Sequence, residues 1–208
     1  MKETAFPPRA VIFDLDGVLL DSFAANAAYY DYIALQMGFA PLSPDDKKLV
    51  HRETHERALK HLAGEGGYER ALALSRRQGA LNLQKHHKLF PGARAVLDRL
   101  QAKAVLAVGT NRDSSARRIL RELGLVSHFA FILTPGEAPE PKPGKGFMDC
   151  LLKKLALEAG DVVYVGDSLV DEQLCRAGGV RLLAFQNEEL RAWAYVNEFT
   201  AIPAALGF

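Results

Sequence analysis

The sequence predicts an α/β protein built on a doubly wound, Rossmann-like parallel sheet, with a helical segment inserted after the first strand. The first observation is a set of short runs rich in Val, Ile, Leu and Phe, at residues 10–13, 105–108, 129–133, 162–165 and 180–185. Nearly continuous apolar runs of this length are typical of parallel strands that are covered on both faces. The second observation is a series of helical patterns between and after the later runs, at residues 93–101, 114–123, 146–158 and 169–177. This β-α-β-α alternation predicts the doubly wound sheet.

The third observation is the long segment between the first two predicted strands. About ninety residues separate Phe13 from Val105, whereas one crossover helix needs only a dozen or so. Residues 23–88 contain no strand-like run, and their pattern predicts three helices, near residues 23–37, 45–62 and 68–87. We therefore expect a core of residues 1–22 and 89–208, and an all-helical cap domain of residues 23–88.

The start of the middle helix of this insertion is signalled by its residue types. Ser43 is a favourable N-cap, and Pro44 fits the first helical position, where the missing N–H has no consequence. Asp45 and Asp46 follow in the first turn, where acidic groups interact well with the helix dipole. The sequence therefore predicts that this helix begins directly after Ser43.

Composition and charge exclude several classes of protein. The chain has 208 residues, 49% of them hydrophobic and 25% charged, and its formal net charge is +1. These values are ordinary for a globular domain and give no overall field that would attract nucleic acid or an anionic membrane.

The two cysteines, Cys150 and Cys175, form no metal-binding pattern, and we expect free thiols in a cytoplasmic protein. We expect no nucleic-acid or membrane partner, and either a monomer or a homodimer.

Polar residues follow the predicted strands at the points where they end. The ends carry Asp14 and Asp16 after the first strand, Thr110 and Asn111 after the second, and Asp167, Ser168 and Asp171 after the fourth. Ligands of open parallel sheets bind at the carboxyl ends of the strands, so we expect these side chains to converge. Carboxylates gathered in this way require a cation or protonation. Oxygen ligands without His or Cys favour Mg²⁺, and Asp171 is placed to support Asp167 or the metal shell.

One lysine is held in a stiff segment after the third strand. Lys142 lies between Pro141 and Pro143, and the prolines restrict the direction in which it points. A lysine and Mg²⁺ beside an acidic pocket can hold a phosphoryl group, and Thr110 and Asn111 add neutral donors. The site therefore predicts phosphoryl transfer.

These residues together resemble the four motifs of the haloacid dehalogenase superfamily. The matching segments, in the order of the family, are Asp14-Leu15-Asp16-Gly17-Val18, Thr110, Lys142 and Gly166-Asp167-Ser168-Leu169-Val170-Asp171. The resemblance covers the core from about Arg9 to Phe185, and the helical insertion lies where that family has its cap. The form of the fourth motif is similar to that of phosphoglycolate phosphatase and its relatives.

The resemblance implies a role for each residue. Asp14 would be the nucleophile that forms an aspartyl phosphate, and Asp16 the general acid and then the general base. Thr110 and Lys142 would bind the phosphoryl oxygens, with Asn111 beside them, and Ser168 and Asp171 would lie behind the metal ligands. Mg²⁺ would be held by Asp14, the backbone carbonyl of Asp16, and Asp167. The expected activity is a Mg²⁺-dependent phosphatase acting on a small phosphorylated metabolite, phosphoglycolate-like or a sugar phosphate.

Two alternatives remain open. Cleavage of carbon–halogen bonds is not one of them. Family members with that activity lack the second aspartate of the first motif, whereas this chain retains Asp16. A phosphomutase of the beta-phosphoglucomutase type shares the first motif but typically carries Glu-Asp-Ser-x-x-Gly in place of the fourth. A non-catalytic regulatory protein that binds phosphate is the alternative outside the enzymes. Within the insertion, residues 49–55 show no specificity pattern that identifies the substrate.

Two further groups suggest sites but have simpler explanations. His51 and His55 are four residues apart with Glu53 between them, yet neither zincin pattern fits, and we expect an exposed helix face. A basic group formed by Arg112, Arg117, Arg118 and Arg121 lacks interleaved aromatic residues. We therefore expect it to be a solvated helix face.

Overall fold

The computed structural model describes residues 7–53, 55–78, 88–112 and 115–208. The chain divides into two compact units: one contains the residues up to 20 together with 89–208, and the other contains residues 21–88. We call them the α/β unit and the helical unit. In the described part of the chain, no helix combines the length and the apolarity that a membrane crossing requires.

The α/β unit is built on a six-stranded sheet, which confirms the predicted fold class. The strand order is β5-β4-β1-β6-β7-β8, and all five pairings are parallel. The strands span β1 Ala10–Phe13, β4 Val105–Gly109, β5 Phe131–Leu133, β6 Val162–Gly166, β7 Arg181–Phe185 and β8 Ala194–Val196. The sequence analysis did not predict β8, because it has only three residues and its Tyr195 is exposed.

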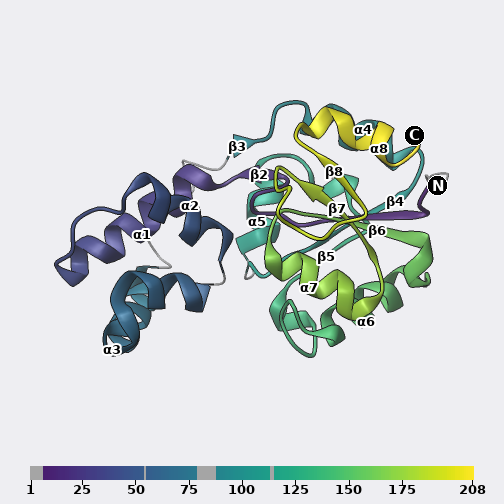
Figure 1. Ribbon diagram of the computed structural model, residues 1–208. Coiled ribbons are helices and arrows are strands. Elements are labelled where there is room, and N and C mark those ends of the chain that lie inside the picture. The colour runs from purple at the N-terminus through teal and green to yellow at the C-terminus, as the bar shows by residue number, and fades with distance from the viewer. Residues whose placement is uncertain (1–6, 54, 79–87, 113–114) are drawn as a thin grey trace. The chain divides into compact units, whose positions relative to one another are not determined.

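Helices cover both faces of this sheet (Figure 1). On one face, α4 (Ala93–Gln101), α5 (Ser115–Glu122) and α8 (Ile202–Ala205) pack their apolar side chains against alternate residues of the strands. On the other face, α6 (Lys145–Leu155) and α7 (Leu169–Gly178) do the same. Residue 114, where one of these helices was expected to begin, lies outside the described residues. Short 3-10 helices complete the unit at Val126–His128, Pro135–Glu137, Ala159–Asp161 and Phe199–Ala201.

The register of the central strands places the polar strand ends at one edge of the sheet. Phe13, the last residue of β1, pairs with Val108 of β4 on one side and with Val165 of β6 on the other. Because all three strands run in the same direction, the residues that directly follow them lie at the same edge of the sheet. The backbone N–H of Asp14 continues this ladder by donating to the carbonyl of Val165, over 2.9 Å.

The helical unit contains α1 (Phe23–Met37), α2 (Pro44–Arg52) and α3 (His55–Gln78), and two of the predicted helix limits are wrong. The expected middle helix is interrupted at Glu53, whose backbone is extended, so α2 ends there. From His55 onward, α3 continues across a kink at Gly64 (φ 67°), a conformation that glycine adopts without strain. Residues 79–87, where the third helix was expected to end, lie outside the described residues.

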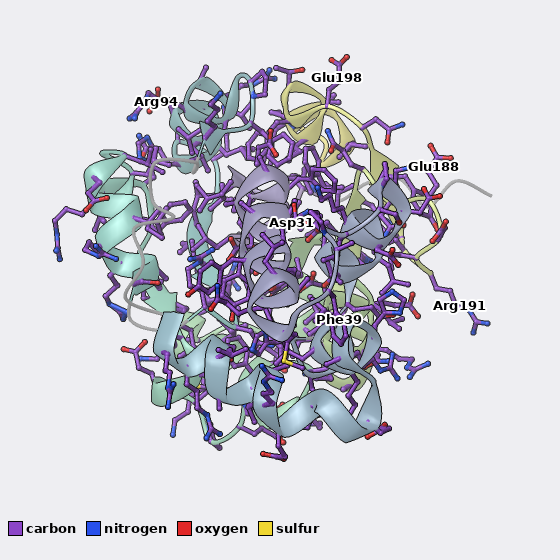
Figure 2. The ribbon with its side chains drawn as sticks, turned by 90° about the vertical axis from the view of Figure 1, so that its left-hand side faces the viewer. Asp31, Phe39, Arg94, Glu188, Arg191 and Glu198 are labelled. Atoms are coloured by element: carbon purple, nitrogen blue, oxygen red, sulfur yellow. The ribbon has the colours of Figure 1, made fainter. Side chains whose placement is uncertain are left out.

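The start of α2 is as predicted. The side chain of Ser43 accepts a hydrogen bond from the backbone N–H of Asp46, and Pro44 occupies the first turn. Asp31 of α1, labelled in Figure 2, fixes the loop that leads into α2. Its carboxylate accepts from the backbone N–H of Leu42 at 2.7 Å and pairs with Lys47 at 2.8 Å. The helices enclose a small apolar core of Tyr30, Ile33, Val50, Ala58, Leu59 and Ala71.

A second, two-stranded sheet is formed where the chain passes from one unit to the other. It pairs β2 (Leu20–Asp21) with β3 (Lys88–Leu89). Each of these strands has two residues, so the chain leaves the α/β unit and returns to it through one short pair of strands.

Candidate active site

Most of the predicted site residues meet at the carboxyl edge of the sheet. Asp14, which follows β1, is 7% exposed, and Thr110, which follows β4, is 1% exposed. Asp167 follows β6 and brings a carboxylate oxygen within 4.8 Å of oxygens from Asp14 and Asp171. The side-chain hydroxyl of Thr110 accepts from the backbone N–H of Arg112 at 3.0 Å. The strand ends therefore gather carboxylates and a hydroxyl, as the sequence predicts.

Lys142 extends its ammonium group into this cluster, where it is buried. Its Nζ donates to Oδ1 of Asp14 at 2.8 Å and to Oδ1 of Asp171 at 2.7 Å. A third bond goes to the hydroxyl of Tyr164 at 2.9 Å. An ammonium group has three N–H donors, so all three are used in this structure.

Tyr164 is a site residue that the sequence analysis missed. It lies within β6, and its ring is fully buried. Its hydroxyl accepts from Lys142 and donates to the carbonyl of Gly109 at 2.6 Å, and so links the end of β4 to the lysine. A buried tyrosine hydroxyl needs a hydrogen-bond partner. A tyrosine inside an otherwise apolar strand run is therefore the signal that could have identified it.

Asp171 belongs to the first turn of α7, and both of its oxygens have partners. Oδ1 accepts from Lys142, and Oδ2 accepts from the hydroxyl of Ser168 at 2.6 Å and from its backbone N–H at 3.2 Å. The side chain of Ser168 in turn caps the helix by accepting from the backbone N–H of Asp171. This capping box satisfies free N–H groups at the helix start and orients the carboxylate toward Lys142.

The side chain of Asn111 acts on the backbone of the lysine segment. Its Nδ2 donates to the carbonyl of Lys142 and its Oδ1 accepts from the N–H of Lys142, both at 2.9 Å. Asn111 thereby fixes the position from which Lys142 extends. Its predicted contact with phosphoryl oxygens stays a prediction.

Burial and mutual repulsion shift the pKa values of the clustered carboxyl groups. Burial raises the pKa of Asp14 to about 7, although Lys142 opposes the shift. Burial, and then the charges of Asp171 and Asp14, raise the pKa of Asp167 well above its usual range. Burial alone would lower the pKa of Lys142, but its carboxylate partners raise it. Three carboxyl groups, two of them buried and that of Asp167 half-buried, thus face one charged ammonium group.

This charge imbalance fits a bound divalent cation. The ligand atoms that Asp14, Asp167 and Asp171 offer are all carboxylate oxygens, which suit Mg²⁺ rather than zinc. The oxygens of Asp171 are engaged by Lys142 and Ser168, so Asp14 and Asp167 are the better placed ligands. The backbone of Asp167 is also held, because its carbonyl accepts from the side chain of Asn187 at 2.7 Å. Asn187 was not among the predicted site residues.

Gly17 allows the first motif to approach Asp167. Its φ is +81°, a region that residues with a side chain rarely adopt. A Cβ at this position would lie 2.1 Å from Oδ2 of Asp167, far closer than van der Waals contact. Only glycine leaves room for the carboxylate of Asp167 at this point.

Asp16 forms an ion pair with Arg112 that the sequence analysis did not predict. Nε of Arg112 donates to Oδ2 of Asp16 at 2.8 Å, and the terminal NH2 group of Arg112 donates to Oδ1. The expectation that Arg112 lies on a solvated helix face is wrong, because it precedes α5 and points toward the strand ends. The acid–base and metal-binding roles of Asp16 stay predictions.

The exposure expected of His51 and His55 is confirmed for His55, whereas His51 is half-buried, and the two do not share one helix face. Nδ1 of His51 lies 3.0 Å from Nδ2 of Asn26. His55, at the start of α3, bridges the hydroxyl of Tyr30 through Nδ1 and the hydroxyl of Ser75 through Nε2, each at 3.2 Å. Because the chain breaks at Glu53, the two histidines belong to different helices and bond to different partners.

Comparisons with known proteins agree with the fold and the motifs. The model of the haloacid dehalogenase-like hydrolase family matches residues 11–185. A phosphoglycolate phosphatase of Chromobacterium violaceum is 31% identical over 85% of this chain and 84% of its own length. A phosphoglycolate phosphatase of Rhodospirillum rubrum is 29% identical over 97% of this chain and 92% of its own length.

Solved structures show the same architecture. A haloacid dehalogenase-superfamily hydrolase of subfamily IA from Geobacter sulfurreducens superposes with a TM-score of 0.76 at 29% identity, covering 100% of both chains. A haloacid dehalogenase-like hydrolase from Streptococcus pneumoniae gives a TM-score of 0.86 at 19% identity, covering 96% of this chain and 98% of its own. With the matching family model and the 31% identical relative, these findings show that the chain belongs to the haloacid dehalogenase-like hydrolases, as an enzyme of their phosphatase group.

Proposed function

We propose that this protein is a Mg²⁺-dependent phosphatase that hydrolyses a small phosphorylated metabolite through an aspartyl-phosphate intermediate on Asp14. The observation that carries the proposal is the contact of Asp14 with Lys142 inside a buried group of carboxylates. A carboxylate nucleophile cannot approach an anionic phosphoryl group until cations offset the repulsion. This site has one fixed cation and a set of oxygen ligands for a second.

In the first half-reaction, a carboxylate oxygen of Asp14 forms a bond to phosphorus and the bond from phosphorus to the ester oxygen breaks. Asp16 gives its proton to the departing alkoxide, so that an alcohol leaves. In the second half-reaction, Asp16 takes a proton from water, the resulting hydroxide attacks phosphorus, and the bond to Asp14 breaks. Inorganic phosphate is released, and both aspartates return to their starting states.

Thr110 and Lys142 are the proposed ligands of the phosphoryl oxygens. Because the three N–H groups of Lys142 are engaged by Asp14, Asp171 and Tyr164, one of these bonds has to be shared or exchanged when a phosphoryl oxygen arrives. Of the three partners, Asp14 is the one whose charge changes during the reaction. Lys142 therefore neutralises the nucleophile at rest and is available to the phosphoryl group as the new bond forms.

The metal would be held by the carboxylates of Asp14 and Asp167 and, by resemblance to the family, by the backbone carbonyl of Asp16. When bound, Mg²⁺ supplies positive charge that offsets the negative charge of the phosphoryl group.

The proposed substrate is a short phosphate monoester, phosphoglycolate-like or a sugar phosphate, and the names of the similar curated proteins support the former. We assign substrate selection to residues 23–88, acting as a cap domain. The free thiols of Cys150 and Cys175 support a cytoplasmic location.

Phosphate release tests the proposal directly. The parent chain and an Asp14→Asn variant are assayed with p-nitrophenyl phosphate, phosphoglycolate and a hexose 1-phosphate, each with Mg²⁺ and with EDTA. We expect release by the parent with Mg²⁺ only, and a loss of at least about a thousandfold in the variant. The matched control is Asp149→Asn, because Asp149 is an exposed carboxylate paired with Lys145. Equal rates for the parent and Asp14→Asn would overturn the nucleophilic role.

Product analysis separates the remaining alternatives. Conversion of the hexose 1-phosphate to its 6-phosphate without phosphate release would identify a phosphomutase. Binding of inorganic phosphate with no turnover of any of the three esters would identify a non-catalytic phosphate-binding protein.

A further inference from the structure

Arg112 and Asp16 form a fork-to-fork ion pair at the mouth of the site. Two nitrogens of the guanidinium group donate to the two oxygens of one carboxylate. The side chains are 21% and 27% exposed, so a small solute can reach the pair. The backbone N–H of Arg112 donates to the hydroxyl of Thr110. The guanidinium group therefore belongs to the same short loop as a proposed phosphate ligand.

This pair conflicts with the task that the proposed function gives to Asp16. A carboxyl group that delivers a proton to a leaving group must itself be protonated, whereas a two-bond contact with a guanidinium group favours its ionised form. In the structure both oxygens of Asp16 accept N–H bonds from Arg112. The pair has to open before the leaving group can be protonated, and opening a bidentate charged pair costs least when another group takes over its hydrogen bonds.

The geometry points to a carboxylate of the substrate as that replacement. We propose that Arg112 is a specificity-determining residue that binds a carboxylate carried by the phosphate ester and thereby releases Asp16, which takes up a proton from water and can then give it to the leaving group. The inference rests on the proposed phosphatase function. Asp16 occupies on Arg112 the place that the substrate carboxylate would take, and the exchange of one carboxylate for another preserves the planar, two-bond recognition. A neutral alcohol group offers no such exchange.

Lys142 cannot supply this second anion site. It is 5% exposed, and its three donors go to Asp14, Asp171 and Tyr164. Arg112, in contrast, is partly exposed, and its backbone N–H donates to the hydroxyl of Thr110. The preferred substrates are therefore short phosphate monoesters in which a carboxylate lies within a few bonds of the phosphate.

The test compares phosphoglycolate with ethyl phosphate, which has a similar size and no carboxylate. The variants are Arg112→Ala and Arg112→Lys, and the control is Arg118→Ala, because Arg118 is exposed on α5. We expect the parent to prefer phosphoglycolate. In Arg112→Ala, kcat/KM for phosphoglycolate falls by about 10–100-fold, the range for a lost charged hydrogen bond. For ethyl phosphate it stays constant or rises, because Asp16 is no longer paired. Arg112→Lys restores part of the preference.

Binding in an inactive background keeps this inference separate from the proposed function. Calorimetry measures the affinities of Asp14→Asn and of Asp14→Asn/Arg112→Ala for both esters. Loss of the carboxylate preference in the double variant supports Arg112, even if the parent hydrolyses nothing and the phosphatase proposal fails. An equal fall in kcat/KM for both esters in Arg112→Ala, or an unchanged preference in the double variant, overturns the inference and leaves the phosphatase proposal standing.

Discussion

In the α/β unit, Lys142 lies among buried carboxylates, and burial raises the pKa of Asp14 to about 7. In the helical unit, by contrast, neutral hydrogen bonds join His55 to the hydroxyl groups of Tyr30 and Ser75, and the carboxylate of Asp31 is paired with Lys47. Both arrangements give polar atoms their partners, but only the strand-end cluster has more carboxyl groups than its one ammonium group can offset, so protons or a cation must neutralise the rest. Carboxyl groups removed from water in this way destabilise a folded protein, so their presence at the strand ends indicates function, whereas the histidine bridge indicates packing.

Surface charges provide a second contrast with the site. Arg94, Glu188, Arg191 and Glu198 extend outward from the α/β unit (Figure 2). Exposed charges such as these are solvated and contribute little to stability. Charges that the fold removes from water have a larger effect on stability.

The largest effect is expected when the buried cation is removed. Lys142→Met leaves Asp14 and Asp171 without their ammonium partner, so the free energy of unfolding should fall by about 3–5 kcal/mol in the metal-free protein at pH 7.5. Urea unfolding measures the change. The matched control is Lys145→Met, because the exposed pair of Lys145 with Asp149 should contribute less than about 1 kcal/mol. Similar small losses in both variants would show that the charge cluster does not depend on Lys142.

A smaller effect is expected when a single hydroxyl group is removed from the site. Tyr164→Phe preserves the buried ring but leaves one N–H of Lys142 and the carbonyl of Gly109 without a partner. We expect the free energy of unfolding to fall by about 1–3 kcal/mol. Because Lys142 is less well fixed, kcat should fall while KM changes little. The control for kcat is Tyr195→Phe in β8, which also removes a hydroxyl with two hydrogen bonds, but away from the strand-end site. An unchanged kcat in Tyr164→Phe would show that the hydroxyl has no positioning role.

The smallest effect concerns the histidine bridge of the helical unit. Burial lowers the pKa of His55, so the unfolded chain binds a proton more readily than the folded unit does. The contribution to stability is therefore complete above the unfolded pKa of about 6.5 and is lost as the pH falls below it. Hydrogen-exchange protection factors of α1 amides, compared between pH 7.5 and 5.5, measure this loss. His55→Gln should abolish the pH difference, and a difference that persists in this variant would assign it to another group.

The motifs predicted the α/β unit better than the pattern predicted the helical unit. Asp14 and Asp167 were placed correctly because parallel strands of known register bring their carboxyl ends to one edge. The limits of α2 and α3 were wrong for two reasons: the break at Glu53 lies inside the expected helix 45–62, and the interruption expected between residues 62 and 68 is only a kink at Gly64. No proline or glycine occurs between residues 45 and 62, so the sequence gives no signal for the break at Glu53. Tertiary packing, which a local pattern does not contain, decides where these helices end.

Within the site, the residues that were missed are those that act through their neighbours. Tyr164 was counted as an apolar strand residue, although its hydroxyl joins Lys142 to β4. Arg112 was grouped with the arginines of α5 by sequence proximity, whereas the turn before the helix directs it toward Asp16. A side-chain direction that depends on a turn cannot be deduced from residue spacing.

The carboxyl groups at the strand ends outnumber the one ammonium group of Lys142, and we expect a divalent cation to bind among them. Calorimetric titration of the metal-free protein with Mg²⁺, in two buffers of different ionisation enthalpy, tests it most directly. Because burial raises the carboxyl pKa values, protons occupy part of the site near neutral pH, and the metal must displace them. We predict one Mg²⁺ per chain, release of protons on binding, affinity that rises as the pH increases from 6 to 8, and loss of binding in Asp167→Asn. Absence of Mg²⁺ binding, or binding that is unchanged in Asp167→Asn, would show that the strand-end carboxyl groups do not form a metal site.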